Sequence, residues 1–162
     1  GNIRAITEGR KHVGGHMKGY FKPKNPAKYK GNSSNIIYRS SYELKLFNRL
    51  DADPNVEWWQ SEELNIPYRC KTDGRVHRYF PDVVFKRNDG KTIMIEIKPH
   101  YQTVEPNASK ALTKTGKPRK AYLNEVMTYA KNTSKWKAAE EYCLDRGWEF
   151  LIMTEYELGI KQ

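Results

Sequence analysis

The stretch Phe80–Pro99, FPDVVFKRNDGKTIMIEIKP, decides the fold of this chain. Its second half alternates in the manner of a β-strand, so its isoleucines share one face and the residues between them share the other. That second face ends in a carboxylate and an amine, Glu96 and Lys98. Because burying an unpaired charge is costly, these two residues need a chemical reason to stand in a strand with apolar neighbours.

The same stretch is typical of a β-hairpin, since Asn-Asp-Gly at positions 88–90 separates two apolar runs. Strand pairing brings Asp82, at the start of the first strand, close to Glu96 and Lys98 at the end of the second, where same-face neighbours lie about 7 Å apart. Neighbouring carboxylates disfavour each other's ionisation, and a hard cation such as Mg²⁺ relieves the repulsion. Lys98 can then orient or deprotonate an attacking water, or neutralise charge in the transition state.

The composition indicates a polyanionic partner. The chain has 162 residues and a formal net charge of +10, which suits a single domain that binds nucleic acid rather than one that binds an anionic membrane. No apolar run is long enough to cross a bilayer, so we expect no membrane partner. The two cysteines form no CxxC pair, so they give no zinc-site signature and no disulfide framework.

The chain divides into three parts by composition. Residues 1–16 resemble a tag or linker remnant ahead of Met17, residues 17–40 form a basic N-terminal arm, and residues 41–162 form one domain. The domain's fold class is α/β, with a mixed central β-sheet flanked by helices. The elements expected are a helix near 40–53, strands near 56–60, 64–68, 75–87 and 91–99, helices near 118–131 and 133–147, a strand near 148–154 and a short helix capped by Thr154 and Glu157.

Two groups of basic residues flank the predicted site in the sequence. The first comprises Lys18, Lys22, Lys24, Lys28, Lys30 and Arg39, and the second comprises Lys110, Lys114, Lys117, Arg119 and Lys120. Such runs are often solvated surface, and the first is also compatible with a disordered tail. Two runs of one sign around an acidic site favour a phosphate-binding cleft. Phosphate contacts carry little sequence information, so we expect weak sequence specificity.

The motifs FPDVVF and IMIEIK resemble the signature of the PD-(D/E)xK nuclease superfamily, with Pro81-Asp82 in the first and Glu96-Ile97-Lys98 in the second. The upstream YRSSYE segment resembles the first core helix of that superfamily, whose Glu completes the metal site and corresponds to Glu43. The whole layout is similar to the TnsA-like branch of transposon endonucleases. It looks most like the head-completion nucleases of T-even-like tailed phages.

This resemblance implies a restriction-endonuclease-like fold and a Mg²⁺ site, with Mn²⁺ as the alternative ion and no small-molecule cofactor. It assigns the metal to Glu43, Asp82, Glu96 and the Ile97 carbonyl, and it gives Lys98 the role of assisting the nucleophilic water. Each residue also has a structural explanation: Glu43 fits a capping box with Ser40, Asp82 fits a strand-edge turn, and Glu96 and Lys98 fit a solvated strand face.

The function expected from these features is a metal-dependent DNA endonuclease that hydrolyses phosphodiester bonds. Resemblance alone adds phage head completion by processing of packaged DNA ends, with portal or neck proteins as partners. It also places the protein in the host cytoplasm during assembly, or in the virion head or neck. Two alternatives remain open: a non-catalytic DNA- or portal-binding head assembly protein on the same scaffold, and a TnsA-like transposase subunit.

Overall fold

The structure is a computed structural model that describes residues 18–160. The predicted tag or linker at 1–16 and the predicted start at Met17 lie outside these residues. The helices and strands are, in chain order, β1 (Gly19–Phe21), β2 (Ile36–Tyr38), α2 (Ser41–Ala52), β3 (Val56–Gln60), β4 (Ile66–Arg69), β5 (Val76–Tyr79), β6 (Val83–Arg87), β7 (Thr92–Ile97), α3 (Lys120–Arg146), β8 (Glu149–Met153) and α4 (Glu155–Leu158). None of the described helices is both long and apolar enough to cross a membrane.

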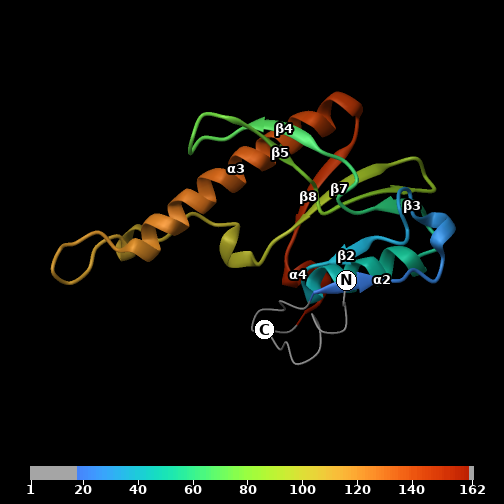
Figure 1. The fold of residues 1–162 in the computed structure, drawn as a ribbon, viewed down its shortest axis with the longest axis horizontal. Helices are drawn as coiled ribbons and strands as arrows, with labels where there is room; N and C mark the ends of the chain where they lie inside the picture. Colours follow the sequence, from blue (N-terminus) through green and yellow to red (C-terminus); the bar gives the residue numbers. More distant parts are fainter. Residues whose placement is uncertain (1–17, 161–162) are drawn as a thin grey trace.

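The central sheet has the strand order β3-β6-β7-β8 (Figure 1). Strand β6 pairs antiparallel with β3 and with β7, whereas β7 and β8 are parallel. The sheet is therefore mixed, and helices pack on it, so the predicted α/β fold is confirmed. Two small antiparallel sheets, β1-β2 and β4-β5, lie outside it.

Strand β7 is buried on both faces, and the alternation in the sequence assigns its residues correctly. The three isoleucines pack in one core cluster with Phe47 of α2, Trp59 of β3 and Leu158 of α4. Met94 belongs to the other cluster, with Ala139 and Cys143 of α3. Helices α2 and α4 thus cover one face of the sheet, and α3 covers the other.

The single strand predicted for residues 75–87 is wrong, because the chain breaks into two strands at Phe80–Asp82. Strand β5 pairs with β4, whereas β6 joins the central sheet. Pro81 has no backbone N–H with which to continue a ladder. The break leaves Asp82 just ahead of β6, outside the paired residues.

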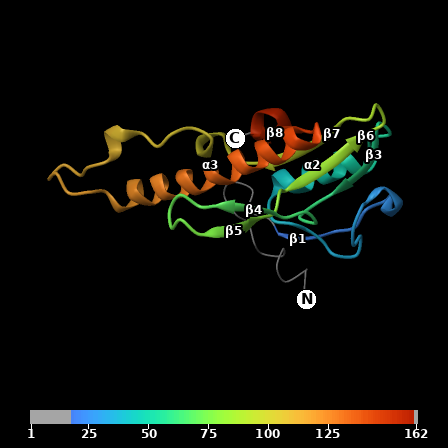
Figure 2. The same cartoon turned by 90° about the horizontal axis from the view of Figure 1, so that it is seen from above.

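The two helices predicted for 118–131 and 133–147 are one continuous helix, α3. The polar residues that suggested an interruption are buried instead: Ser134 donates a hydrogen bond to the Ala130 carbonyl at 2.9 Å and accepts one from the Lys71 N–H at 3.3 Å. Gly147 ends the helix in the left-handed conformation, with φ 71°. The N-terminal half of α3 and the loop before it project well beyond the sheet (Figures 1 and 2).

The N-terminal segment is ordered, so the disordered-tail alternative is wrong for residues 18–40. Phe21 and Tyr29 are buried against Trp59, with ring centroids 5.8 and 4.8 Å away. Edge-on aromatic contacts of this kind fasten the segment to the core.

Candidate active site

Three carboxylates converge at one end of the central sheet. Glu43 comes from the first turn of α2, Glu62 from the loop after β3, and Asp82 from the break before β6. One oxygen of each lies within 4.8 Å of the others. Ligand oxygens around a single Mg²⁺ lie up to about 4.2 Å apart, so this acidic cluster is only slightly wider than a magnesium coordination shell.

Helix α2 holds Glu43 in the cluster. The helix begins at Ser41 because the Ser40 hydroxyl accepts a hydrogen bond from the Glu43 N–H at 3.2 Å. The apolar side of α2 is buried in the core through Phe47 and Leu50, which turns Glu43 inward and leaves it 7% exposed. Glu43 is therefore a cap-associated residue and a member of the cluster at once.

The surroundings of the Glu43 carboxyl group disfavour its ionised form. Burial, followed by repulsion from Glu62, raises the pKa of Glu43 to about 7. Among the described residues, its Oε1 atom is buried and has no hydrogen-bond partner. A buried acceptor without a donor is costly, and a bound cation would satisfy it.

Strand register brings Asp82 and Glu96 together. Val83 pairs with Ile95, so one further step places Asp82 opposite Glu96. The Asp82 Oδ2 atom also accepts a hydrogen bond from the Ile97 N–H at 2.7 Å. Burial, followed by the negative charges of Glu96 and Glu43, raises the pKa of Asp82 well above its usual value.

Glu96 faces Asp82 but is not one of the three converging carboxylates. Its Oε1 accepts a hydrogen bond from the Tyr79 hydroxyl at 2.6 Å, and its Oε2 accepts one from the Trp136 indole at 3.4 Å. Its role as a metal ligand therefore stays a prediction, and so does that of the Ile97 carbonyl. What the structure shows is a buried carboxylate oriented by two aromatic donors.

Two amines lie next to these acids. The Lys98 amine is 3.5 Å from Glu96 Oε2 and keeps a quarter of its side chain exposed. Lys135 of α3 lies over the Tyr79 ring, 5.9 Å from its centroid. Burial lowers the pKa of Lys135, and repulsion from Lys98 adds to this while attraction to Glu96 opposes it. Lys98 was predicted, whereas Lys135 was not.

Glu62 was also missed by the sequence reasoning. It is the one described non-glycine residue with positive φ, at 56°, a conformation that is uncommon outside glycine. Both of its oxygens bind the Arg39 guanidinium at 3.0 Å. Strand β3 ends beside the start of β6, because Gln60 pairs with Val84, so the same register places Glu62 opposite Asp82. A correct pairing of β3 with β6 would have found it.

The first group of basic residues is partly committed to the protein itself. The Lys28 ammonium donates hydrogen bonds to the carbonyls of Leu50, Asp51 and Asp53, at 2.7 to 3.0 Å, and so caps the end of α2. Lys30 lies over the Trp58 ring, 4.3 Å from its centroid. Since all three Lys28 donors are used, we remove this residue from the predicted phosphate contacts. Contacts by Lys22, Lys24, Lys30 and Arg39 stay predictions.

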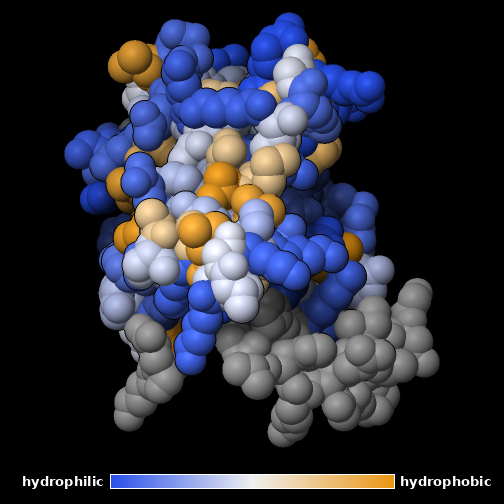
Figure 3. All heavy atoms as spheres, turned by 90° about the vertical axis from the view of Figure 1, so that its left-hand side faces the viewer, coloured by the Kyte–Doolittle hydropathy of each residue, from blue (hydrophilic) through white to orange (hydrophobic). Residues whose placement is uncertain are grey.

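The second group is exposed and lies on the projecting end of the molecule (Figure 1). We call Lys110, Lys114, Lys117, Arg119 and Lys120 the basic loop. The 3-10 turn at Pro26–Lys28 lies at the opposite end of the long axis (Figure 1), whereas Arg39 of the first group binds Glu62 at the acidic cluster. A phosphate-binding cleft between the two groups stays a prediction. Seen from the projecting end, hydrophilic side chains surround a central apolar patch (Figure 3).

The donor set of the acidic cluster fits a hard divalent cation. All of its atoms are carboxylate oxygens, which suit Mg²⁺ and Mn²⁺, and no imidazole or thiol joins them. The unpaired Glu43 oxygen and the raised pKa values of Glu43 and Asp82 also favour a bound cation, which would satisfy the oxygen and offset the repulsion between the acids. The residues present therefore fit the predicted ion.

Comparisons with known proteins identify the family of this chain. Residues 53–155 match the family model described as TnsA-like endonuclease N terminal. The chain is also 42% identical over 137 residues to the head completion nuclease of Enterobacteria phage T4, across 85% of this chain and 90% of that protein. The matched family segment contains Glu62, Asp82, Glu96 and Lys98, and Glu43 precedes it. The chain therefore belongs to the TnsA-like endonuclease family.

Proposed function

We propose that this endonuclease cleaves DNA by Mg²⁺-dependent hydrolysis of phosphodiester bonds at the acidic cluster, with Mn²⁺ as a substitute ion. The observation that carries the proposal is the cluster itself: carboxylates within 4.8 Å of one another, one with an unpaired buried oxygen, next to the Lys98 amine. Groups that repel one another in this way persist where function requires them.

The residues of the site have different roles in the proposed reaction. Glu43, Glu62 and Asp82 would hold the ion, which supplies positive charge to the phosphoryl oxygens and lowers the pKa of water. Lys98 points its amine at the same region and positions the attacking water or offsets charge in the transition state. Tyr79 and Trp136 fix Glu96, which in turn holds the Lys98 amine at 3.5 Å.

The biological setting follows from the relative in phage T4, whose name is head completion nuclease. We propose that this chain acts in the same stage of phage assembly and processes packaged DNA ends. Portal or neck proteins would be its partners, in the host cytoplasm or in the virion head or neck. The identity of 42% over most of both chains supports this assignment.

A plasmid-nicking assay tests the activity. Wild-type protein should convert supercoiled plasmid to open-circle and linear forms with Mg²⁺ and should lose this activity in EDTA. The double variant Asp82→Ala, Lys98→Ala should be inactive, while Lys71→Ala, at an exposed position outside the site, should cut normally. Cleavage that persists in the double variant would place the chemistry elsewhere.

Calorimetric titration with Mn²⁺ gives a second readout that does not depend on turnover. Wild-type protein should bind the ion, and Asp82→Ala should not. A protein that binds DNA but neither binds Mn²⁺ nor nicks plasmid would support the alternative of a non-catalytic DNA-holding protein.

A further inference from the structure

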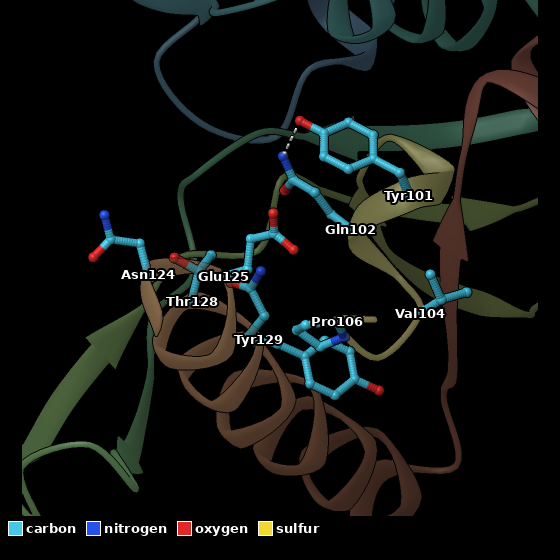
Figure 4. Close-up of a pocket in the computed structure, with 9 residues that line it drawn as sticks. Tyr101, Gln102, Val104, Pro106, Asn124, Glu125, Thr128 and Tyr129 are labelled. Carbon is cyan, nitrogen blue, oxygen red and sulfur yellow. Dashed lines mark hydrogen bonds between the residues drawn. The ribbon is translucent and has the colours of Figure 1, made fainter. Parts of the chain in front are cut away.

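A cavity of about 250 Å³ lies between α3 and the segment that follows β7 (Figure 4). Tyr101 and Gln102 form part of one wall, and Glu125, Tyr129 and Asn132 of α3 form part of the other. Pockets for drug-sized ligands span roughly 300–1,000 Å³. This cavity therefore suits a smaller group, of the size of one planar ring system.

Both walls of the cavity continue directly into the acidic site. Tyr101 is three residues after Lys98, a span of at most about 10 Å. On the other wall, Asn132 is one helical turn, about 6 Å, before Trp136, whose indole donates to Glu96. Successive nucleotides of one strand rise about 3.4 Å in a duplex, so the cavity lies within a few nucleotides of a phosphate at the site.

The charge of the cavity excludes a phosphate as its occupant. Its nine lining residues, all within the described part of the chain, include no lysine or arginine. They include Glu125, whose carboxylate rises from α3 toward Gln102 in Figure 4. A phosphate would meet repulsion without compensation, whereas a neutral donor-bearing group would meet an acceptor.

The chemistry of the walls matches a nucleobase. Tyr101 is 72% exposed, and its hydroxyl accepts a hydrogen bond from the Gln102 amide at 3.0 Å, which orients the ring. Tyr129 offers a second aromatic surface across the opening (Figure 4). Amide and carboxylate groups of Gln102, Glu125 and Asn132 can read the edge of a base, while aromatic rings stack on its face.

We propose that this cavity binds one unpaired nucleobase of the DNA substrate, close to the phosphate that is cut. A base inside a duplex cannot enter a pocket without leaving the stack. The enzyme therefore prefers DNA with unpaired nucleotides, such as a frayed end or a fork, over fully paired duplex. This inference rests on the proposed function, because it assumes that DNA occupies the acidic site.

Fluorescence titration with forked DNA tests the inference. The probe carries 2-aminopurine at an unpaired position beside the junction, and Ca²⁺ replaces Mg²⁺ so that the DNA is not cut. Wild-type protein should quench the fluorescence by stacking and should bind the fork more tightly than a blunt duplex. Tyr101→Ala should weaken fork binding about 5- to 150-fold, the range for loss of one stacked base, and should leave duplex binding unchanged.

Leu144→Ala is the control, since this side chain is 79% exposed on α3 and does not line the cavity. It should bind both DNAs like the wild type. Equal affinity of wild-type protein for fork and duplex, or equal losses on both DNAs in Tyr101→Ala, would overturn the inference. Parallel nicking assays keep the two proposals apart: fork binding through Tyr101 without Mg²⁺-dependent cleavage contradicts the nuclease assignment alone, and cleavage without fork preference contradicts the base site alone.

Discussion

The acidic cluster and the basic loop differ in construction as much as in charge. The cluster is held by the core: Glu43 is buried, Asp82 accepts a backbone hydrogen bond, and Glu62 is gripped by Arg39. The side chains of the basic loop are exposed on a projection of the molecule. Catalysis depends on precise placement of the reacting groups, which the fixed side chains of the cluster provide. The long, solvent-exposed cations of the basic loop are better suited to binding phosphates. Changes in the two regions should therefore separate rate from binding.

The largest effect is expected at Lys98. Lys98→Met should lower the cleavage rate by about 10²–10⁴-fold, the usual contribution of a positioned proton-transfer group, and should change DNA affinity in Ca²⁺ less than twofold. Single-turnover cleavage and a binding titration measure the two quantities. Lys114→Met in the basic loop is the matched control and should cut at the wild-type rate on saturating DNA. Similar losses of cleavage rate in Lys98→Met and Lys114→Met would contradict the assignment of catalysis to the acidic site and of DNA binding to the basic loop.

The basic loop should show the reverse pattern. Changing Lys110, Lys114 and Lys117 to Gln together should weaken DNA binding about 10- to 100-fold at physiological salt. It should also lower the slope of log affinity against log salt by up to about 3, because each phosphate contact contributes about 0.9. The rate on saturating DNA should not change.

A charge-matched control separates contact from net charge. The exposed residues Lys71, Lys91 and Lys137 lie outside the basic loop, and their conversion to Gln removes the same formal charge. If this control variant loses as much affinity and slope as the loop variant, the loop has no special role.

The cluster should also make metal-free protein sensitive to pH. The pKa of Glu43 is about 7 in the folded protein and near its ordinary value of about 4 in the unfolded chain. In the folded protein, Glu43 therefore stays protonated to a higher pH than in the unfolded chain. The free energy of unfolding consequently falls as the pH rises from about 4 through 7. Urea denaturation in EDTA should show the free energy of unfolding of wild-type protein falling by about 3–4 kcal/mol more than that of Glu43→Gln over this range, since each pKa unit corresponds to about 1.4 kcal/mol. Parallel pH profiles for the two proteins would contradict the raised pKa.

The smallest effect is expected at Lys28, which the sequence groups with phosphate-binding residues. Lys28→Met should lower the free energy of unfolding by about 1–2 kcal/mol, because carbonyls at the end of α2 lose their donor. DNA affinity should stay the same. Urea denaturation and a binding titration measure both, and Lys22→Met should leave stability unchanged. A loss of affinity in Lys28→Met would return this lysine to the phosphate contacts.

Local signals in the sequence were sufficient for much of the fold. The alternation in β7, the turn at 88–90 and the Ser40 cap each depend on a few neighbouring residues, and each is present in the structure. The register of this hairpin also placed Asp82 beside Glu96. The mixed sheet followed from these elements and their order.

Features that depend on contacts between distant segments were not predictable in the same way. Helix α3 continues through Asn132 and Ser134 because the β4–β5 hairpin packs on that point and Lys71 bonds to Ser134. Glu62 enters the cluster through the pairing of β3 with β6, and Trp136 reaches Glu96 from α3, on the face of the sheet that this helix covers. Residue type and spacing along the chain carry no signal for such contacts until the register is known.

The unbroken α3 has a mechanical consequence. Its 27 residues span about 40 Å, and its exposed tip lies about 24 Å from Trp136. If the packed half acts as a pivot, a tilt of about ten degrees swings the tip by about 4 Å yet barely shifts the indole that steadies Glu96. The exposed N-terminal end of α3 can therefore adjust to DNA of variable shape, while the packed end keeps Trp136 and Glu96 in position.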